Sequence, residues 1–250
     1  MNEGAAHYLD WKDWVDEAFG NFDDLLACYY AAETGLSASA LNRVLEIGFG
    51  NGSFIGWSHS IGAEVFGVEL NPSLVDRCER FLGQERAFAD LADERLTALE
   101  GTFTHIVAFD VLEHITQAAL PAFLQRLSNL LAADGRIIVR FPNGDSPFGR
   151  INQHGDPTHV TTIGRMMLVY FADTAGLAVA EIRAPKLPLT GLGFRRLAKR
   201  VMLKAGRSLV ERILGALYFG GVTVALDPNY TAILRHRTRN PAEVDSTQKM

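Results

Sequence analysis

Residues 43–54 carry the clearest pattern in this chain and read Arg43-Val44-Leu45-Glu46-Ile47-Gly48-Phe49-Gly50-Asn51-Gly52-Ser53-Phe54. A short apolar strand here runs directly into three glycines at every second position. Because glycine has no Cβ, such a loop lets the backbone come close to a ligand. The helix expected to follow would offer free N–H groups at its N-terminus. The pattern therefore predicts a nucleotide-type cofactor at the carboxyl edge of a parallel sheet.

Two classes of cofactor fit a glycine loop of this kind. The dinucleotide fingerprint requires glycine or alanine as its third small residue, and this chain has Ser53 at that position. The chain instead reads E-x-G-x-G-x-G, starting at Glu46. The loop by itself does not separate the two classes, so the choice rests on the motifs that follow it.

Acidic residues stand at the ends of the next three predicted strands, at Glu69, Asp90 and Asp110. In an open α/β sheet the carboxyl ends of the strands line one crevice, where these side chains would meet. Glu69 follows Glu46 by 23 residues and is placed to hold both hydroxyls of a ribose. Asp90 and Asp110 are also suited to capping helices, so their role stays open at this point.

Four motifs, VLEIGFGNGSF, GVEL, FADL and VAFDVLEHI, resemble those of the class I S-adenosylmethionine-dependent methyltransferases. The resemblance covers residues 40–184, and the last predicted strand is similar to the family more weakly. Its FDVLEHI run is the more specific part, because a dehydrogenase has no reason to carry it. The resemblance implies an enzyme of the Rossmann-like methyltransferase fold that uses S-adenosylmethionine as its cofactor.

The resemblance also assigns roles to individual residues. Glu69 would hold the ribose hydroxyls, Asp90 and Leu91 would face adenine, and Asp110 would lie near the methionine moiety. Glu46 would position the loop or meet the amino group of the cofactor. The full set implied to contact the cofactor is Glu46, Gly48, Gly50, Asn51, Gly52, Glu69, Leu70, Asp90, Leu91 and Asp110.

The composition is that of an ordinary globular protein. A chain of 250 residues can form one sizeable domain, or one domain with an appendage. Its net charge of −5 gives no reason to expect nucleic acid as a partner. Cys28 and Cys78 form no C-x-x-C motif, which is typical of a reducing compartment and indicates no metal framework. We find no signal-peptide pattern and no run of 18 apolar residues, and therefore expect a cytoplasmic protein.

Strand and helix patterns alternate along the core, which predicts βαβ units and a doubly wound α/β fold. We expect a seven-stranded, mostly parallel sheet whose last two strands form an antiparallel edge. The predicted strands are residues 43–47, 63–69, 86–90, 105–110, 136–141, 177–183 and 230–237. The predicted helices between them are residues 51–61, 72–82, 117–132 and 164–175, and we expect the third to end at Asp134-Gly135.

Helical patterns outside the core suggest further parts of the molecule. Helices over 7–34 would form a flap on the cofactor edge, and a helical insertion would precede the last strand. The expected division is 1–40 for the N-terminal helical flap, 41–184 and 222–238 for the methyltransferase core, 185–221 for the insertion and 239–250 for a disordered tail.

Residues 142–162 are predicted to form a long loop above the crevice, and loops of that length are usually functional. Histidine titrates near neutral pH, so His159 is the first candidate for a catalytic base and His154 the second. Asp156 is a candidate to orient a neighbouring imidazole. The D-P-T-H tetrad resembles a motif in a branch of these methyltransferases that modifies sugars, glycans or small metabolites. The same residues also suit a simple turn.

Other polar residues near the crevice are weaker candidates. His114 follows the fourth strand and is the third candidate to face the acceptor. We expect no metal ion at His154, Asp156 and His159, because two loop histidines five residues apart match no strong ligand spacing. Arg140 suits a phosphate or carboxylate on the acceptor, or simply solvent.

The expected insertion has a basic character. Between residues 193 and 214, seven basic residues stand against the single acid Glu211, and apolar residues recur at roughly helical spacing. A basic amphipathic helix is typical of peripheral contact with a membrane, which we consider for 193–219. We favour over this a helical cap that packs on the core with a solvated basic rim, or a contact between two copies.

The function that we predict is O-methylation of a small metabolite, a sugar or a glycan intermediate. The first alternative is N- or C-methylation of a small molecule or of an isoprenoid or quinone-like ring. The second alternative is a non-catalytic partner or sensor that binds S-adenosylmethionine. The expected partner is a small-molecule or glycan acceptor, and the oligomeric state stays open.

Overall fold

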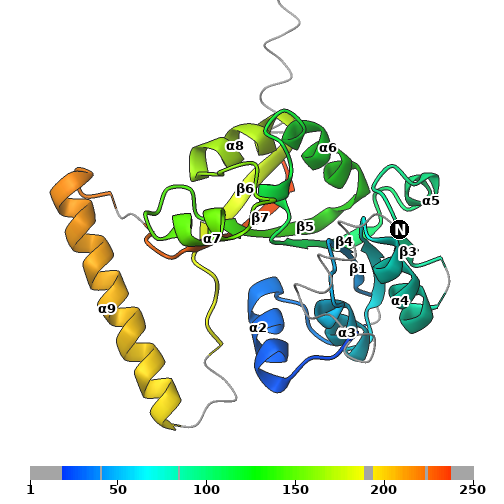
Figure 1. Cartoon of the computed structure of the whole chain (residues 1–250), viewed down its shortest axis with the longest axis horizontal. Coiled ribbons are helices and arrows are strands. Elements are labelled where there is room, and N and C mark those ends of the chain that lie inside the picture. Colours follow the sequence, from blue (N-terminus) through cyan, green and yellow to red (C-terminus); the bar gives the residue numbers. More distant parts are fainter. Residues whose placement is uncertain (1–18, 40, 84, 189–193, 223–224, 238–250) are drawn as a thin grey trace, which may run out of the picture.

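The computed structural model describes residues 19–39, 41–83, 85–188, 194–222 and 225–237. Within these residues, seven strands form one sheet in the order β3-β2-β1-β4-β5-β7-β6 (Figure 1). The strand β7 is antiparallel to both β5 and β6, and the other pairs are parallel. This is the predicted mostly parallel sheet with an antiparallel edge. The predicted disordered tail, 239–250, and the first part of the helical flap lie outside the described residues.

The strands are β1 (Arg43–Ile47), β2 (Glu64–Val68), β3 (Ala87–Phe88), β4 (Phe103–Phe109), β5 (Leu131–Pro142), β6 (Leu177–Arg183) and β7 (Asn229–His236). The helices are α2 (Asp24–Thr34), α3 (Ser53–Ser60), α4 (Pro72–Leu82), α5 (Glu94–Thr97), the 3₁₀ turn η2 (Leu112–His114), α6 (Leu120–Leu130), α7 (Gly149–Gly155), α8 (Arg165–Thr174) and α9 (Phe194–Tyr218).

The central strands are buried on both faces, so they read as continuous apolar runs and not as alternating ones. Neighbouring residues of a strand point to opposite faces. Val44 therefore joins the core beneath α3 and α4, where Phe54 and Leu74 lie, while Leu45 joins the core beneath α6 and α8. Figure 1 shows α6 and α8 on one side of the sheet and α2, α3 and α4 on the other. Because helices cover both faces of the sheet, the carboxyl ends of β1, β2 and β4 lie together along one open edge.

The sequence misplaced the end of α6 and the start of β5. The helix ends at Leu130 and not at Asp134-Gly135, and β5 begins at Leu131 and not at residue 136. Leu131 is buried, adopts an extended backbone and pairs with Phe103 of β4. This long-range pairing draws the chain into the sheet before the local stop signal is reached.

The segment 142–162 is not the uninterrupted loop that the sequence predicted, because it contains α7. The helix has no clear apolar repeat and depends on tertiary contacts. Its first residue, Gly149, lies so close to Asn143 that an added Cβ would come 2.0 Å from the Asn143 carbonyl oxygen. Close approach of two backbones, and not hydrophobic periodicity, positions this turn.

The predicted helical insertion before the last strand is present as α9, which lies to one side of the sheet in Figure 1. Two contacts tie it to the segment before β7. Arg207 Nη1 lies 3.1 Å from Asp227 Oδ2, and Glu211 Oε1 accepts a hydrogen bond from Leu226 N at 2.9 Å. Among the described residues, no helix combines the length and the apolar character needed to cross a membrane.

Candidate active site

The glycine loop between β1 and α3 has the backbone that its sequence requires. Gly48, Gly50 and Gly52 have φ of 68°, 52° and 73°, in the left-handed region that favours glycine. At Gly48 an added Cβ would also lie 2.8 Å from Val111 Cγ2. The loop therefore leaves its backbone open toward the sheet edge, with the N-terminus of α3 directly behind it.

Two acidic side chains flank this loop. Glu69 follows β2, and its carboxylate accepts hydrogen bonds from Gly50 N at 3.3 Å and from Asn71 N at 3.1 Å. Glu46 is 5% exposed, and its Oε2 has no hydrogen-bond partner among the described residues. Burial and the nearby Glu69 raise the pKa of Glu46 well above its usual range. An unsatisfied buried acceptor of this kind fits a ligand that brings hydroxyl or ammonium donors.

The other residues predicted for the cofactor gather at the same edge. Asp90 Oδ1 accepts a hydrogen bond from Ala92 N at 2.9 Å, and Asn51 Oδ1 accepts one from Ser53 N at 3.2 Å. All of the predicted cofactor residues line one cavity except Gly52. Gly52 lies beneath the loop, against the ring of Phe19.

Asp110 and Arg140 form an ion pair at this edge, so Arg140 is not a solvated residue. Arg140 Nε donates to Asp110 Oδ1 at 3.0 Å, and Nη2 pairs with the second carboxylate oxygen. Arg140 Nη1 also donates to the Tyr29 hydroxyl of α2 at 2.8 Å. Asp110 itself has a positive φ of 57°, which is uncommon for a residue other than glycine. The contacts tie α2, the described part of the predicted flap, to the end of β4.

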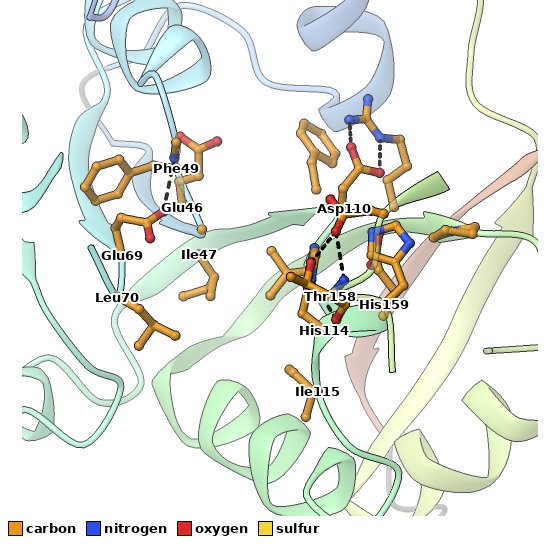
Figure 2. Close-up of a pocket in the computed structure, with 18 of the residues that line it drawn as sticks. Glu46, Ile47, Phe49, Glu69, Leu70, Asp110, His114, Ile115, Thr158 and His159 are labelled. Carbon is orange, nitrogen blue, oxygen red and sulfur yellow. Dashed lines mark hydrogen bonds and ion pairs between the residues drawn. The ribbon is translucent and has the colours of Figure 1, made fainter. Parts of the chain in front are cut away.

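The opposite end of the cavity is built by η2 and by the segment that follows α7 (Figure 2). The backbone N–H groups of Val160 and Thr161 donate to the carbonyl oxygen of Glu113, at 2.9 and 3.1 Å. These bonds hold His159 against η2. The ring of His159 meets that of His114 edge-on, and its Nε2 lies 3.9 Å from Glu113 Oε1.

Asp156 acts on His114 through Thr158. Its carboxylate accepts hydrogen bonds from Thr158 N at 2.9 Å and from the Thr158 hydroxyl. That hydroxyl oxygen lies 3.0 Å from Nδ1 of His114. Because the Thr158 proton is directed to Asp156, its oxygen accepts from His114, whose Nδ1 then carries the proton. The predicted aspartate–imidazole link thus involves the Thr158 hydroxyl, because the D-P-T sequence turns the carboxylate back onto its own chain.

The structure separates the two histidines of the loop. His159 and Asp156 line the cavity, whereas His154 is exposed on α7 and is not among the lining residues. The sequence ranked His114 below both, yet His114 lies in the cavity beside His159.

Glu113 is a feature of the site that sequence reasoning did not single out. It is 1% exposed, and neither carboxylate oxygen has a hydrogen-bond partner within the described part of the chain. Burial, together with the negative charges of Asp110 and Asp156, raises the pKa of Glu113 to about 8. Its position within FDVLEHI, directly after the fourth strand, is the sequence signal that points to it.

Both ends belong to one cavity of about 1020 Å³, which is ample for a cofactor and a small second molecule. In Figure 2, Glu46 and Glu69 lie on one side of it, and His114, Thr158 and His159 lie on the other. Tyr29 and Tyr30 of α2 also line it and were not predicted as site residues.

A family model described as a methyltransferase domain matches residues 6–182. The chain belongs to this methyltransferase family. It is thus an enzyme, and its methyl donor is S-adenosylmethionine. The glycine loop, the unsatisfied Oε2 of Glu46 and the Glu69 carboxylate fit that donor at the first end of the cavity.

Solved structures of methyltransferases share the fold. A SAM-dependent methyltransferase from Archaeoglobus fulgidus matches with a TM-score of 0.59 and 20% identity, over 91% of this chain and 98% of that one. A TehB-like SAM-dependent methyltransferase from Corynebacterium glutamicum matches with a TM-score of 0.58 and 16% identity, over 95% and 100%. Geranyl diphosphate C-methyltransferase from Streptomyces coelicolor matches with a TM-score of 0.52 and 19% identity, over 85% and 78%. No curated protein matches the sequence significantly.

Proposed function

We propose that this methyltransferase transfers its methyl group to a hydroxyl oxygen of a small metabolite, a sugar or a glycan intermediate. The observation that carries the proposal is the set of Glu113, His114 and His159 in the same cavity as the glycine loop, at its opposite end. An unactivated hydroxyl must lose its proton as it is methylated, and histidine is the residue that most often accepts such a proton.

S-adenosylmethionine supplies a methyl group on a positively charged sulfur, and the neutral thioether that remains after transfer is a good leaving group. The enzyme then has two tasks, namely to align the acceptor oxygen and to remove its proton. We assign proton removal to His159, with the Glu113 carboxylate 3.9 Å away to stabilise the imidazolium that forms. His114, oriented through Thr158, is assigned to hold the acceptor hydroxyl.

The cofactor end of the proposal uses the residues of the predicted set. Glu69 is assigned to the ribose hydroxyls, Glu46 to the amino group, and Asp90 with Leu91 to the adenine edge. Support comes from their shared cavity and from the unsatisfied Oε2 of Glu46. Asp110 is assigned to the methionine end, where its ion pair with Arg140 sets the position of its carboxylate.

Other acceptor atoms are possible for this fold. One structural neighbour is a mitomycin 7-O-methyltransferase and another is a geranyl diphosphate C-methyltransferase. We favour oxygen here because two histidines and a buried carboxylate meet where the acceptor would lie. An amine that binds unprotonated already has a free lone pair on nitrogen, so its methylation needs no general base.

The proposal is tested with a panel of sugars, phenols, amines and isoprenoid or quinone-like rings. S-adenosylhomocysteine formation is measured for each, and the site of the new methyl group is determined by mass spectrometry and NMR. We expect methyl ethers as products. Turnover that yields only N-methyl or C-methyl products would overturn the assignment to oxygen.

We also propose that α9 contacts an anionic membrane surface, which would bring an amphiphilic acceptor to the enzyme. Support comes from exposed apolar side chains on α9, including Leu209, Ile213 and Leu217, together with exposed basic residues such as Lys199 and Lys204. Such a combination favours a lipid headgroup region over plain solvent.

A further inference from the structure

We propose that Glu113, His114 and His159 form a binding site for one divalent transition-metal ion at the acceptor end of the cavity. The three side chains each offer one ligand atom, and these atoms all lie within 4.8 Å of one another. Two ligand atoms on one tetrahedral zinc ion stand about 3.4 Å apart, so small side-chain rotations bring the three onto a single ion. This set differs from His154, Asp156 and His159, the three residues for which the sequence predicted no metal ion.

The first independent observation is the state of the Glu113 carboxylate. The side chain is 1% exposed, and neither of its oxygens has a hydrogen-bond partner among the residues that the structure describes. A buried carboxylate without donors is costly, and proteins normally pair such groups with cations or metal ions. The positively charged Arg140 does not meet this need, because its guanidinium pairs with Asp110 and Tyr29.

The second observation is the support of His114. Its Nδ1 faces two oxygens of Thr158, the hydroxyl at 3.0 Å and the carbonyl at 3.3 Å, and the hydroxyl is in turn held by Asp156. This contact places the lone pair of the imidazole on Nε2. Metal-binding histidines almost always donate their second N–H to an oxygen in this way, which fixes the tautomer and the ring orientation.

The ligand types indicate which ions fit. Two imidazoles and one carboxylate suit zinc, iron, cobalt or nickel, whereas magnesium and calcium prefer all-oxygen sites. Three protein ligands leave at least one position open, as in catalytic zinc sites. All three residues line the cavity, so the open position faces the space reserved for the acceptor.

The role of the ion rests on the proposed O-methylation, although its binding does not. The acceptor hydroxyl takes the open position, where a divalent ion lowers its pKa, as it lowers that of water from 15.7 to about 7. The hydroxyl proton leaves to solvent, and the oxygen lone pair forms the new bond to the methyl carbon. The carbon–sulfur bond breaks, and its electron pair stays on sulfur. When the ion is bound, His159 is one of its ligands and no longer accepts the proton. The ion then activates the hydroxyl in place of His159.

Binding is tested with the metal alone, on protein freed of metal with a chelator. Calorimetric titration with zinc chloride, and separately with cobalt chloride, should show one site per chain. Glu113→Gln and His159→Ala should each weaken that site at least tenfold. His59→Ala serves as the matched control, because His59 is exposed on α3 outside the cavity and should leave binding unchanged. Cobalt binding should also give a visible absorption spectrum that the two site variants lose.

Folding of the variants is checked by thermal unfolding. Glu113→Gln keeps the shape of the side chain and cannot ionise in its buried position, so its melting temperature without metal should equal or exceed that of the parent protein. Absence of a one-to-one site, or a site that persists in both variants, would overturn the metal proposal. Undiminished O-methylation by chelator-treated enzyme would overturn only the catalytic role of the ion. A protein that binds metal yet makes only N-methyl or C-methyl products would overturn only the proposed O-methylation.

Discussion

The ring of His159 stands edge-on against the ring of His114, with the two centroids 4.6 Å apart and the ring planes at 78°. The two residues come from separate segments, the segment after α7 and the turn after β4. The backbone bonds from Val160 and Thr161 to Glu113 keep them together. The acceptor end of the cavity therefore has a fixed architecture, and each of its parts can be removed singly.

Replacing His159 with alanine should lower the rate of methyl transfer by a factor of about 10² to 10⁴, the usual contribution of a general base. Cofactor affinity should not change, because His159 lies across the cavity from Glu46 and Glu69. The measurements are single-turnover kinetics and calorimetric titration with S-adenosylhomocysteine. An equal loss in the His59→Ala control, or an unchanged rate in His159→Ala, would contradict the assignment.

We assign Thr158 to the positioning of His114, through its hydroxyl group. Thr158→Val keeps the shape of the side chain but removes the link from Asp156 to His114. We expect kcat to fall about tenfold or more, with a shifted pH profile, because His114 Nδ1 then keeps only its longer contact, 3.3 Å to the Thr158 carbonyl oxygen. Thr158→Ser restores the hydroxyl and should recover most of the rate. If valine and serine behave alike, the link does not orient His114.

Gly48→Ala should abolish tight cofactor binding. The added methyl group meets Val111 Cγ2 at 2.8 Å, and the residue must also hold a φ of 68°. A left-handed backbone costs a residue with a side chain about 1–2 kcal/mol. Adding Val111→Ala removes the steric contact but not the backbone strain, so the double variant should recover binding only in part. Full recovery in calorimetric titration would show that the loop tolerates a side chain.

Acid should destabilise the protein through His105. Burial, with smaller contributions from Arg136 and Arg235, lowers the pKa of His105 to about 4. The unfolded chain, with a pKa near 6.5, binds the proton more readily, so stability falls as the pH drops from about 6.5 to 4. The loss approaches about 3 kcal/mol at its upper limit. Urea unfolding at several pH values measures it, and His105→Leu should flatten the curve over this window; an unchanged slope would contradict the assignment.

The sequence predicted those parts of the fold that depend on local patterns. The bounds of α4 and β6 follow from the Asn71-Pro72 start signal and from a clear apolar strand, and both agree with the structure. The end of α6 did not follow, because Leu131 leaves the helix to pair with Phe103 of a distant strand. A stop signal at Asp134-Gly135 carries no information about that pairing.

The two ends of the cavity also differ in how far the sequence alone predicts them. The glycine loop follows β1 and the strand-end acids follow β2, β3 and β4, so the sheet order alone brings them to one edge. The acceptor end depends on hydrogen bonds between Val160 and Glu113, which no local pattern encodes. The sequence singled out both His159, which lines the cavity, and His154, which does not, and it overlooked Glu113 as a buried carboxylate.

The exposed helix α9 leads to a prediction about membranes. Leu209, Ile213 and Leu217 are 60%, 49% and 70% exposed, and Lys199 and Lys204 are exposed as well. Basic residues near an anionic bilayer contribute about 1 kcal/mol each, and this attraction weakens as salt rises. The protein should therefore co-sediment with phosphatidylglycerol vesicles at low salt, and less with phosphatidylcholine vesicles.

Two variants separate the contributions to this binding. Lys199→Gln combined with Lys204→Gln should reduce binding to the anionic vesicles and its dependence on salt. Leu209→Ser combined with Ile213→Ser should reduce binding at every salt concentration, because apolar burial is not screened. Absence of co-sedimentation at low salt would refute the membrane contact. Self-association without vesicles that the serine variant abolishes would instead identify α9 as a contact between two copies of the chain.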